Sequence, residues 1–233
     1  MKPQEDFVYF AYLDILGYKE YLSADIKNTS LEFKEKLVEA SSVLNSINSA
    51  HYHHKEISDS IFIHSASVCL LEFLATVKKI FNHYLNCKLL LRGGISYSKH
   101  FENNSMTYSL ALTEAYILES QHAIYPRVLI HSTIIDTVRN FADGGESRYL
   151  LELLDSKMVC VDGSLYFLNT IDDGCWDEYY NTVKDLYLKN KKDIDKNSNL
   201  RMKYIWLHYY IFSKKPKSIR KAIFIENMQM LSN

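Results

Sequence analysis

The sequence predicts an α+β fold built on a ferredoxin-like β-α-β-β-α-β core, with extra strands and C-terminal helices. Three observations support this prediction. Residues 7–13 (FVYFAYL) form an apolar run of strand length, and residues 69–85 place apolar side chains at helical spacing. Between them, two short runs broken at Ser58-Asp59 indicate a β-hairpin. In such a unit the first strand lies between the third and the fourth.

Each element of this core has its own signal in the sequence. The first strand ends at Asp14, and Ser30 is available to cap the helix that follows. The Gly93-Gly94 pair inside the last strand predicts a bulge or a close backbone approach. The elements expected, in order, are strand 7–13, helix 31–47, strands 51–57 and 61–64, helix 69–85 and strand 88–99.

The remainder of the chain predicts further strands and helices. A second hairpin turns at Asp162-Gly163. The lysine-rich stretch 189–196 is typical of a solvated loop, here between the last two helices. The elements expected are helix 110–121, strand 128–131, helix 133–141, strands 158–161 and 165–168, and helices 176–192 and 199–213.

Length and charge limit the classes of protein that fit. The chain has 233 residues, of which 47% are hydrophobic, so it can bury a sizeable core. We expect one domain over 1–170 and a helical extension over 171–233 packed on it. A formal net charge of −1 argues against a nucleic-acid partner or an anionic membrane surface. No apolar run approaches the roughly 18 residues of a membrane span, and the first residues lack a signal-peptide pattern.

The cysteines and histidines predict no metal centre. Four cysteines without CxxC spacing indicate free, buried thiols in a reducing cytoplasm. His51 and His53 would share one face of a strand, but His54 points to the opposite face, which disfavours a zinc site. His64 and His100 are expected to lie at the margin of the core.

Two carboxylates carry the strongest chemical signal. The first strand of the predicted unit runs antiparallel to the third, so Asp14 at the end of one meets Asp59 at the start of the other. Converging carboxylates at strand ends suit Mg²⁺ or Mn²⁺ held together with a substrate phosphate. The alternative is local: Asp14 would cap the next helix, and Asp59 would serve the turn.

Five ordered motifs extend this interpretation to a family. The motifs are FAYLDILGY at 10–18, ISDSIFI at 57–63, LRGGISYS at 91–98, ALTEAYILES at 111–120 and YPRVLIH at 125–131. In this order they resemble the class III nucleotide cyclase homology domain, and most closely its bacterial antiphage branch, the pyrimidine cyclases of Pycsar systems. The resemblance is dense over residues 7–131 and thin afterwards, although KYIWL at 203–207 also fits the bacterial branch.

The resemblance implies a site and a reaction. Asp14 and Asp59 match the family's two metal-binding, catalytic aspartates, and Ile15 matches the position whose carbonyl completes the shell of the second ion. Two Mn²⁺ or Mg²⁺ ions per active site are implied. The ribose 3′-hydroxyl of a nucleoside triphosphate then attacks the α-phosphate and pyrophosphate leaves. Residues 1–170 would form the cyclase-like catalytic domain.

Three cationic residues are candidates for binding the nucleotide. Lys55 precedes Asp59 by four residues, where many class III cyclases place a side chain that reads the base; an exposed strand lysine is the alternative. Arg92 would reach phosphate or pair with a carboxylate on the sheet. Arg127 follows a proline, a rigid placement that suits a phosphate contact.

Two departures from the family pattern favour the antiphage branch. Thr113 and Ile117 replace an Asn/Arg pair that many eukaryotic-type cyclases carry, and Ser58 replaces the glycine that usually precedes the second aspartate. The resemblance thus implies a cytoplasmic homodimer that converts UTP or CTP to the 3′,5′-cyclic monophosphate, an antiviral second messenger read by a separate effector protein. The alternatives are a purine cyclase and a non-catalytic nucleotide-binding or scaffold module.

Overall fold

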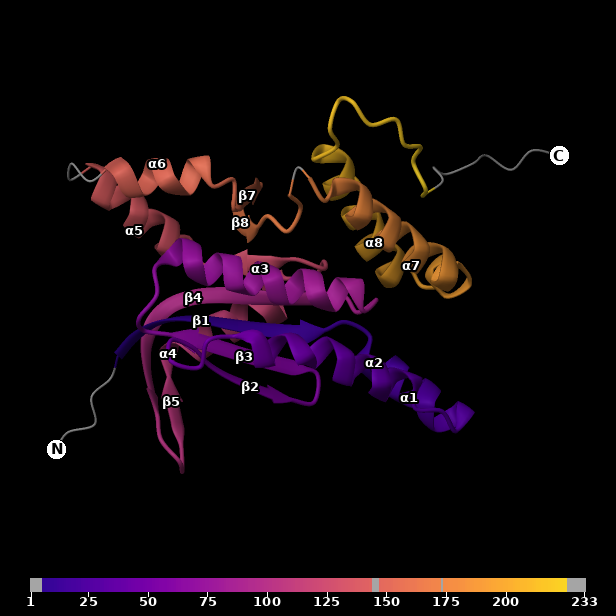
Figure 1. Cartoon of the computed structure of the whole chain (residues 1–233), viewed down its shortest axis with the longest axis horizontal. Helices are drawn as coiled ribbons and strands as arrows, with labels where there is room; N and C mark the ends of the chain where they lie inside the picture. Colours follow the sequence, from indigo (N-terminus) through magenta and orange to yellow (C-terminus); the bar gives the residue numbers. More distant parts are fainter. Residues whose placement is uncertain (1–5, 144–146, 173, 226–233) are drawn as a thin grey trace. The chain divides into compact units, whose positions relative to one another are not determined.

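The computed structural model describes residues 6–143, 147–172 and 174–225. The chain divides into two compact units, Met1–Thr170 and Ile171–Asn233. The first unit carries the sheet, and the second is helical (Figure 1). Among the described residues, no helix combines the length and the apolar character that crossing a membrane requires.

The first unit is organised around one mixed sheet. Its strand order is β2-β3-β1-β4-β6-β8-β7, with β5 paired to β4, so the first strand lies between the third and the fourth as predicted. The α+β fold with a β-α-β-β-α-β core is therefore confirmed. The strands are β1 (Asp6–Ile15), β2 (His53–Ile57), β3 (Ser60–Ser65), β4 (Leu91–Glu102), β5 (Thr107–Ser109), β6 (Val128–Ile130), β7 (Val159–Asp162) and β8 (Leu165–Leu168).

Helices cover both faces of this sheet. α3 packs on one face, where it shares a large core with odd-numbered residues of β1, and α4 packs on the opposite face (Figure 1). The helices and helical turns of the unit are α1 (Tyr18–Asn28), α2 (Glu32–Ser41), η1 (Ser42–Ser46), α3 (Leu70–Asn86), α4 (Leu110–Ile117), η2 (Leu118–His122), α5 (Ser132–Asp143) and α6 (Ser147–Asp155).

β1 is apolar on one face and carries polar groups on the other. Ala11 and Leu13 are fully buried in the core beneath α3. Successive strand residues alternate between faces, so Phe10, Tyr12 and Asp14 lie on the α4 side. The same alternation places the even-numbered residues of β3 and β4 beside them. Asp14 and its ladder neighbours Ser60 and Arg92 therefore lie on the α4 side of the central strands.

The glycine pair of β4 marks a close approach and not a bulge. The β1–β4 register is continuous through Leu13↔Gly93 and Tyr12↔Gly94, so the expectation of a bulge is wrong. A Cβ on Gly93 would lie 2.4 Å from the carbonyl oxygen of Tyr12, and one on Gly94 would lie 2.3 Å from that of Ala115 in α4. The missing side chain at Gly94 lets α4 rest directly on the sheet.

The second unit consists of α7 (Trp176–Lys196) and α8 (Ser198–Ser213) with the segment that follows. Trp176 is fully buried and donates from Nε1 to the carbonyl oxygen of Ile211 at 2.8 Å. The lysine-rich stretch 189–196 belongs to α7 and is not a loop, because Ile194 anchors it in the core while its charges face outward.

The cysteines are free, as predicted, but only two of them are buried. Cys87 and Cys160 are inside the first unit, whereas Cys69 and Cys175 are exposed. Both exposed cysteines stand at the residue preceding a helix, where the chain turns at the surface.

Candidate functional site

The end of β1 and the β2–β3 turn bring Asp14 and Asp59 to one edge of the sheet. The amide of Ile15 donates to the carbonyl oxygen of Asp59 at 2.9 Å, which fixes the two segments side by side. Asp14 is paired across the ladder with Ser60 on one side and with Arg92 on the other. Asp14 is a strand residue, and the helix after it is preceded by Gly17, so the helix-cap alternative is wrong.

The turn that presents Asp59 contains a strained residue. Ser58 has φ 59°, in the left-handed region that favours glycine. β2 ends at Ile57 and β3 begins at Ser60, so only two residues reverse the chain. The resembled family carries glycine at this position. Here Ser58 adopts the left-handed backbone conformation that glycine would adopt.

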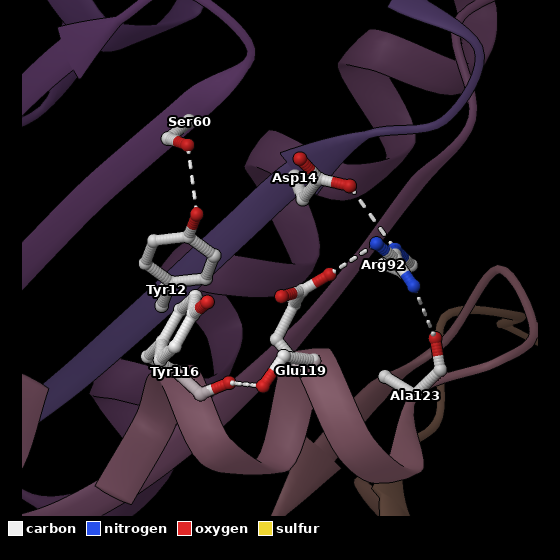
Figure 2. Close-up of polar contacts among 8 residues, drawn as sticks. Tyr12, Asp14, Ser60, Arg92, Tyr116, Glu119 and Ala123 are labelled. Atoms are coloured by element: carbon white, nitrogen blue, oxygen red, sulfur yellow. Dashed lines mark hydrogen bonds and ion pairs between the residues drawn. The ribbon is translucent and has the colours of Figure 1, made fainter. Parts of the chain in front are cut away.

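Arg92 joins Asp14 to a third carboxylate. Its Nε lies 3.0 Å from Asp14 Oδ2, and its Nη2 lies 2.7 Å from Glu119 Oε1 (Figure 2). Its Nη1 also reaches the carbonyl oxygen of Ala123 at 3.5 Å. Of the two alternatives for Arg92, phosphate contact or pairing with a carboxylate on the sheet, the structure displays the second.

Glu119 is the functional candidate that the sequence analysis missed. It is 3% exposed and lies in η2, a single π-helical turn that continues α4. Burial raises the pKa of Glu119 to about 7; the positive charge of Arg92 opposes this rise, and the negative charges of Asp14 and Asp59 add to it. Three carboxylates thus interact at one place, and π-turns of this kind are frequent at functional sites.

A periodicity in the sequence points to Glu119. The buried residues of α4 are Ala111 and Ala115, four residues apart. Continuing the same step reaches residue 119, so a helical reading places this carboxylate on the buried face. A buried glutamate beside two buried alanines is unusual, because an isolated charge there is costly without a partner.

Aromatic side chains border the carboxylates on the α4 side of the sheet. Tyr12 packs edge-on against Phe62, with ring centroids 5.3 Å apart. It also packs edge-on against Tyr116, with ring centroids 5.4 Å apart (Figure 2). The hydroxyl groups of Tyr12 and Ser60 are hydrogen-bonded at 2.8 Å. Burial raises the pKa of Tyr12, the hydrogen bond with Ser60 opposes this, and the charges of Glu119, Asp14 and Asp59 add to it.

Lys55 lies on the same face, one row of the ladder away from Asp14. Lys55 pairs with Phe62, and Phe62 pairs with Tyr12, so all three side chains share the α4 side. Lys55 is exposed on β2, at the end of the strand order. The structure therefore places Lys55 on the face that carries the carboxylates, separated from them by the aromatic residues.

Arg127 is placed differently from the other candidates. Its side chain is 4% exposed and donates from Nη1 to Asp162 Oδ2 at 2.6 Å. The guanidinium also lies over the rings of Tyr125 and Phe167. Only its backbone approaches β4, where its carbonyl oxygen accepts from the amide of Gly93 at 3.0 Å. This arrangement stabilises the β6–β8–β7 part of the sheet.

The donor set at the end of β1 fits a hard divalent ion. Asp14, Asp59 and the carbonyl of Ile15 would hold Mn²⁺ or Mg²⁺, which prefer oxygen ligands. In an extended strand the carbonyl and amide of one residue point to the same edge, so the Ile15 carbonyl is directed toward the turn with Asp59. The raised pKa of Glu119, to which both aspartates contribute, marks the accumulated negative charge that a cation would relieve.

The family's helical Asn/Arg pair has no equivalent here. The hydroxyl of Thr113 donates to the carbonyl oxygen of Ser109 within α4, and Ile117 is 40% exposed. Neither residue offers a charge to a phosphate. Arg92 and Lys55 are the cationic candidates on the α4 face.

A cavity of about 370 Å³ lies on the other face of the sheet. Tyr9 and Tyr97 form its floor, and residues of α3, α5 and α6 complete it, including Leu70, Ile134 and Leu153. Its lining contains none of the residues that the sequence predicts for the site.

Comparison with known proteins shows similarity in solved structures alone. No family model matches the chain, and no curated protein sequence matches it. The adenylyl cyclase CyaB from P. aeruginosa is 14% identical over 74% of this chain and 98% of its own, with a TM-score of 0.46. A bacterial light-regulated adenylyl cyclase is 11% identical over 79% and 100%, with a TM-score of 0.49. The guanylyl cyclase Cya2 is 8% identical over 74% and 96%, with a TM-score of 0.35.

Proposed function

We propose that this chain is a metal-dependent nucleotidyl cyclase that converts a pyrimidine ribonucleoside triphosphate, UTP or CTP, to its 3′,5′-cyclic monophosphate and pyrophosphate. The observation that carries the proposal is the meeting of Asp14 and Asp59 where β1 ends and β3 begins. The ordered motifs over residues 7–131 support the same function. Residues 1–170 are proposed as the catalytic domain.

The reaction needs a deprotonated hydroxyl and a neutralised triphosphate. The 3′-oxygen of the ribose gives up its proton to solvent, forms a bond to the α-phosphorus, and the bond from that phosphorus to pyrophosphate breaks. Two divalent ions, when bound, lower the pKa of the hydroxyl and neutralise charge on the phosphates. Asp14, Asp59 and the Ile15 carbonyl hold these ions, and Arg92, released from Asp14, contacts a phosphate oxygen.

The preference for a pyrimidine rests on the resemblance to the antiphage branch and on the aromatic side chains of the α4 face. The rings of Tyr12, Phe62 and Tyr116 lie on this face, and we propose that they restrict the base to a single ring. Lys55, at its edge, would donate to a base carbonyl. A purine triphosphate remains the alternative substrate, since Lys55 would equally donate to a purine oxygen or nitrogen. We further propose a cytoplasmic homodimer whose product is an antiviral messenger for a separate effector.

One observation favours a second candidate function. The guanidinium of Arg92 already bridges Asp14 and Glu119, so a cation is present beside the carboxylate proposed to bind metal. If Arg92 holds that position permanently, the domain would bind nucleotide without turnover. It would then act as a cyclase-like binding or scaffold module.

Product analysis of the purified protein tests both functions. The chain is incubated with each of the four ribonucleoside triphosphates and with Mn²⁺ or Mg²⁺, and products are identified by mass. Asp14→Asn and Asp59→Asn should each reduce turnover on the order of 10³-fold or more. Asp136→Asn, an exposed aspartate on α5, is the matched control and should retain activity.

The outcomes separate the candidates. Cyclic UMP or cyclic CMP as the main product supports the proposal, whereas cyclic AMP or cyclic GMP overturns the pyrimidine assignment alone. Triphosphate binding without any cyclic product, measured at equilibrium with the same protein, favours the binding module. Full activity of a folded Asp14→Asn variant would overturn the metal site itself.

A further inference from the structure

Three potential metal ligands converge at the far end of the α4 face, away from Asp14. His64 on β3, and His100 and Glu102 at the end of β4, present ligand atoms that all lie within 4.8 Å of one another. His64 is paired with Phe10 of β1, four residues before Asp14. At about 3.3 Å per strand residue, the cluster is roughly 13 Å along β1 from that aspartate. It is therefore separate from the proposed catalytic carboxylates.

His100 is buried without the hydrogen bonds that a buried imidazole requires. It is 6% exposed, and neither of its ring nitrogens has a hydrogen-bond partner among the described residues. Glu102 Oε2 lies 3.7 Å from its Nε2, which is longer than a hydrogen bond. Leaving a buried polar group unsatisfied costs about 1–3 kcal/mol, so such a group in a folded protein points to a missing partner.

Two of the three separations between ligand atoms are close to those around a shared ion, and the third is within 4.8 Å. Two ligands bound tetrahedrally at about 2.1 Å from one metal lie about 3.4 Å apart. Glu102 Oε2 is 3.4 Å from His64 Nε2 and 3.7 Å from His100 Nε2. An ion between these three atoms would satisfy the nitrogen of His100 that the protein itself does not.

The surroundings hold the ligands in place. The ring of Phe10 stacks on His64 at 5.5 Å and packs against His100 at 5.6 Å, forming an apolar floor. The hydroxyl of Thr107, on the paired strand β5, donates to the other oxygen of Glu102 at 3.5 Å. Groups that orient a ligand in this way are common around protein metal sites.

The chemistry of the donors selects the kind of ion. Neutral imidazole favours zinc, cobalt, nickel or copper, whereas Mg²⁺ prefers oxygen ligands. Burial, followed by the neighbouring charges of His100 and His53, lowers the pKa of His64 to about 4, and Glu102 opposes this. Burial also lowers the pKa of His100.

We propose that His64, His100 and Glu102 form a binding site for a divalent transition metal such as Zn²⁺. This site is distinct from the oxygen-lined site at Asp14 and Asp59. Three protein ligands would leave a fourth coordination position open to water, since the side chain of Glu102 is 42% exposed. His53, whose ring stacks on His64 at 5.2 Å, borders that side. The proposal is independent of the cyclase activity.

Direct metal binding tests the proposal with the full-length protein. The metal-free protein is titrated with Zn²⁺ in competition with a chromophoric chelator, and separately with Co²⁺ while its visible absorption is recorded. We expect one Zn²⁺ per chain, a tetrahedral Co²⁺ spectrum, no displacement by excess Mg²⁺, and a melting temperature that rises with Zn²⁺. Asp14→Asn, as a control, should leave all four results unchanged.

Substitutions assign the ligands. His64→Ala should abolish tight Zn²⁺ binding, and Glu102→Gln, a change at an exposed and isosteric position, should weaken it at least tenfold. His54→Ala is the matched control, since this neighbouring histidine lies on the opposite face of β2. Folding of every variant is checked by circular dichroism in the absence of metal. Absence of stoichiometric Zn²⁺ binding by the wild type, or unchanged affinity in folded Glu102→Gln and His64→Ala, overturns the site.

Discussion

Arg92 Nε and Asp14 Oδ2 are 3.0 Å apart, and the same guanidinium lies 2.7 Å from Glu119. One cation is thus shared between a carboxylate at the end of β1 and another on the π-turn η2. The side chain of Asp14 is 15% exposed and that of Glu119 is 4% exposed, so water compensates little of either charge. Arg92 is consequently the group on which the charge balance of this site depends in the absence of metal.

Replacing Arg92 should destabilise the metal-free protein and increase the rise in melting temperature that Mn²⁺ causes. Arg92→Gln removes the guanidinium that Asp14 and Glu119 share, and we expect a loss of about 2–4 kcal/mol in the free energy of unfolding. Mn²⁺ should then raise the melting temperature more in this variant than in the wild type, because it no longer competes with the guanidinium. Thermal unfolding at several Mn²⁺ concentrations measures both effects.

A double variant provides the control for this prediction. In Arg92→Gln combined with Glu119→Gln, the buried charge is removed together with its partner, so part of the lost stability should return. An equal Mn²⁺ response in the wild type and in Arg92→Gln would show that Arg92 does not compete with metal at Asp14.

Arg127 should matter for stability more than for nucleotide binding. Arg127→Met removes the ion pair with the half-exposed Asp162 and the ring contacts, and we expect a loss of about 1–2 kcal/mol in the free energy of unfolding. The KM for the triphosphate should be unchanged at a temperature where the variant is folded. A large rise in KM with an unchanged melting temperature would instead favour the phosphate contact that the sequence predicts.

Asp25 should make stability sensitive to acid. Burial raises its pKa, but hydrogen bonds from the amide of Phe33, the hydroxyl of Ser30 and the amide of Lys34 outweigh burial and hold the pKa below its ordinary value. The folded state therefore binds fewer protons here than the unfolded state, and stability falls as the pH drops from about 5 through the folded pKa.

The Asp25→Asn variant tests this dependence. It keeps an oxygen acceptor but cannot titrate, so its melting temperature should fall less between pH 5 and pH 3 than that of the wild type. Asp136→Asn serves as the comparison at an exposed position. Parallel pH curves for Asp25→Asn and the wild type would contradict the prediction.

Ser58 should tolerate glycine and reject a β-branched residue. At φ 59° serine carries a cost of about 1–2 kcal/mol that glycine avoids, while glycine loses about 0.5–1 kcal/mol through the greater freedom of the unfolded chain. Ser58→Gly should therefore leave the melting temperature unchanged or slightly raised, and Ser58→Val should lower it. A clear loss of stability in Ser58→Gly would mean that the serine side chain supports the turn.

The proposed homodimer predicts complementation between inactive variants. The family resemblance implies metal ligands from one chain and base contacts partly from the other, so Asp14→Asn and Lys55→Ala damage different halves of a shared site. When the two are mixed, one site of each mixed dimer is intact, which restores about a quarter of wild-type activity. No recovery after exchange, or an active monomer by light scattering, would contradict this arrangement.

The sequence predicts the core of the first unit because its strands and α3 are strongly patterned. It misses α1, which contacts the core through the half-buried Tyr18 and Tyr21 and whose one fully buried residue is the acidic Asp25, so its apolar pattern is weak. It also misses β5, which has only three residues. The stretch 189–196 is interpreted as a loop because its charges dominate, although one buried side chain, Ile194, holds it in a helix.

Some residues of the candidate site can likewise be predicted from the sequence, and others cannot. Asp14 and Asp59 follow from strand order and a tight turn, both of which leave local signals. The bridge from Arg92 to Glu119 does not, because it depends on where a π-turn sets a side chain relative to a strand 27 positions earlier. The convergence of His64 with His100 likewise depends on pairing across β1, which no local pattern reveals.

Gly94 sets the distance between α4 and the sheet, although it carries no charge. The backbone of α4 packs against this glycine so closely that the space between helix and sheet has no room for a methyl group. An alanine at 94 would act as a wedge, and η2, rigidly continued from α4, would carry Glu119 outward from Arg92 and Asp14. A purely steric change at position 94 would therefore loosen the cluster of charges without replacing any charged residue.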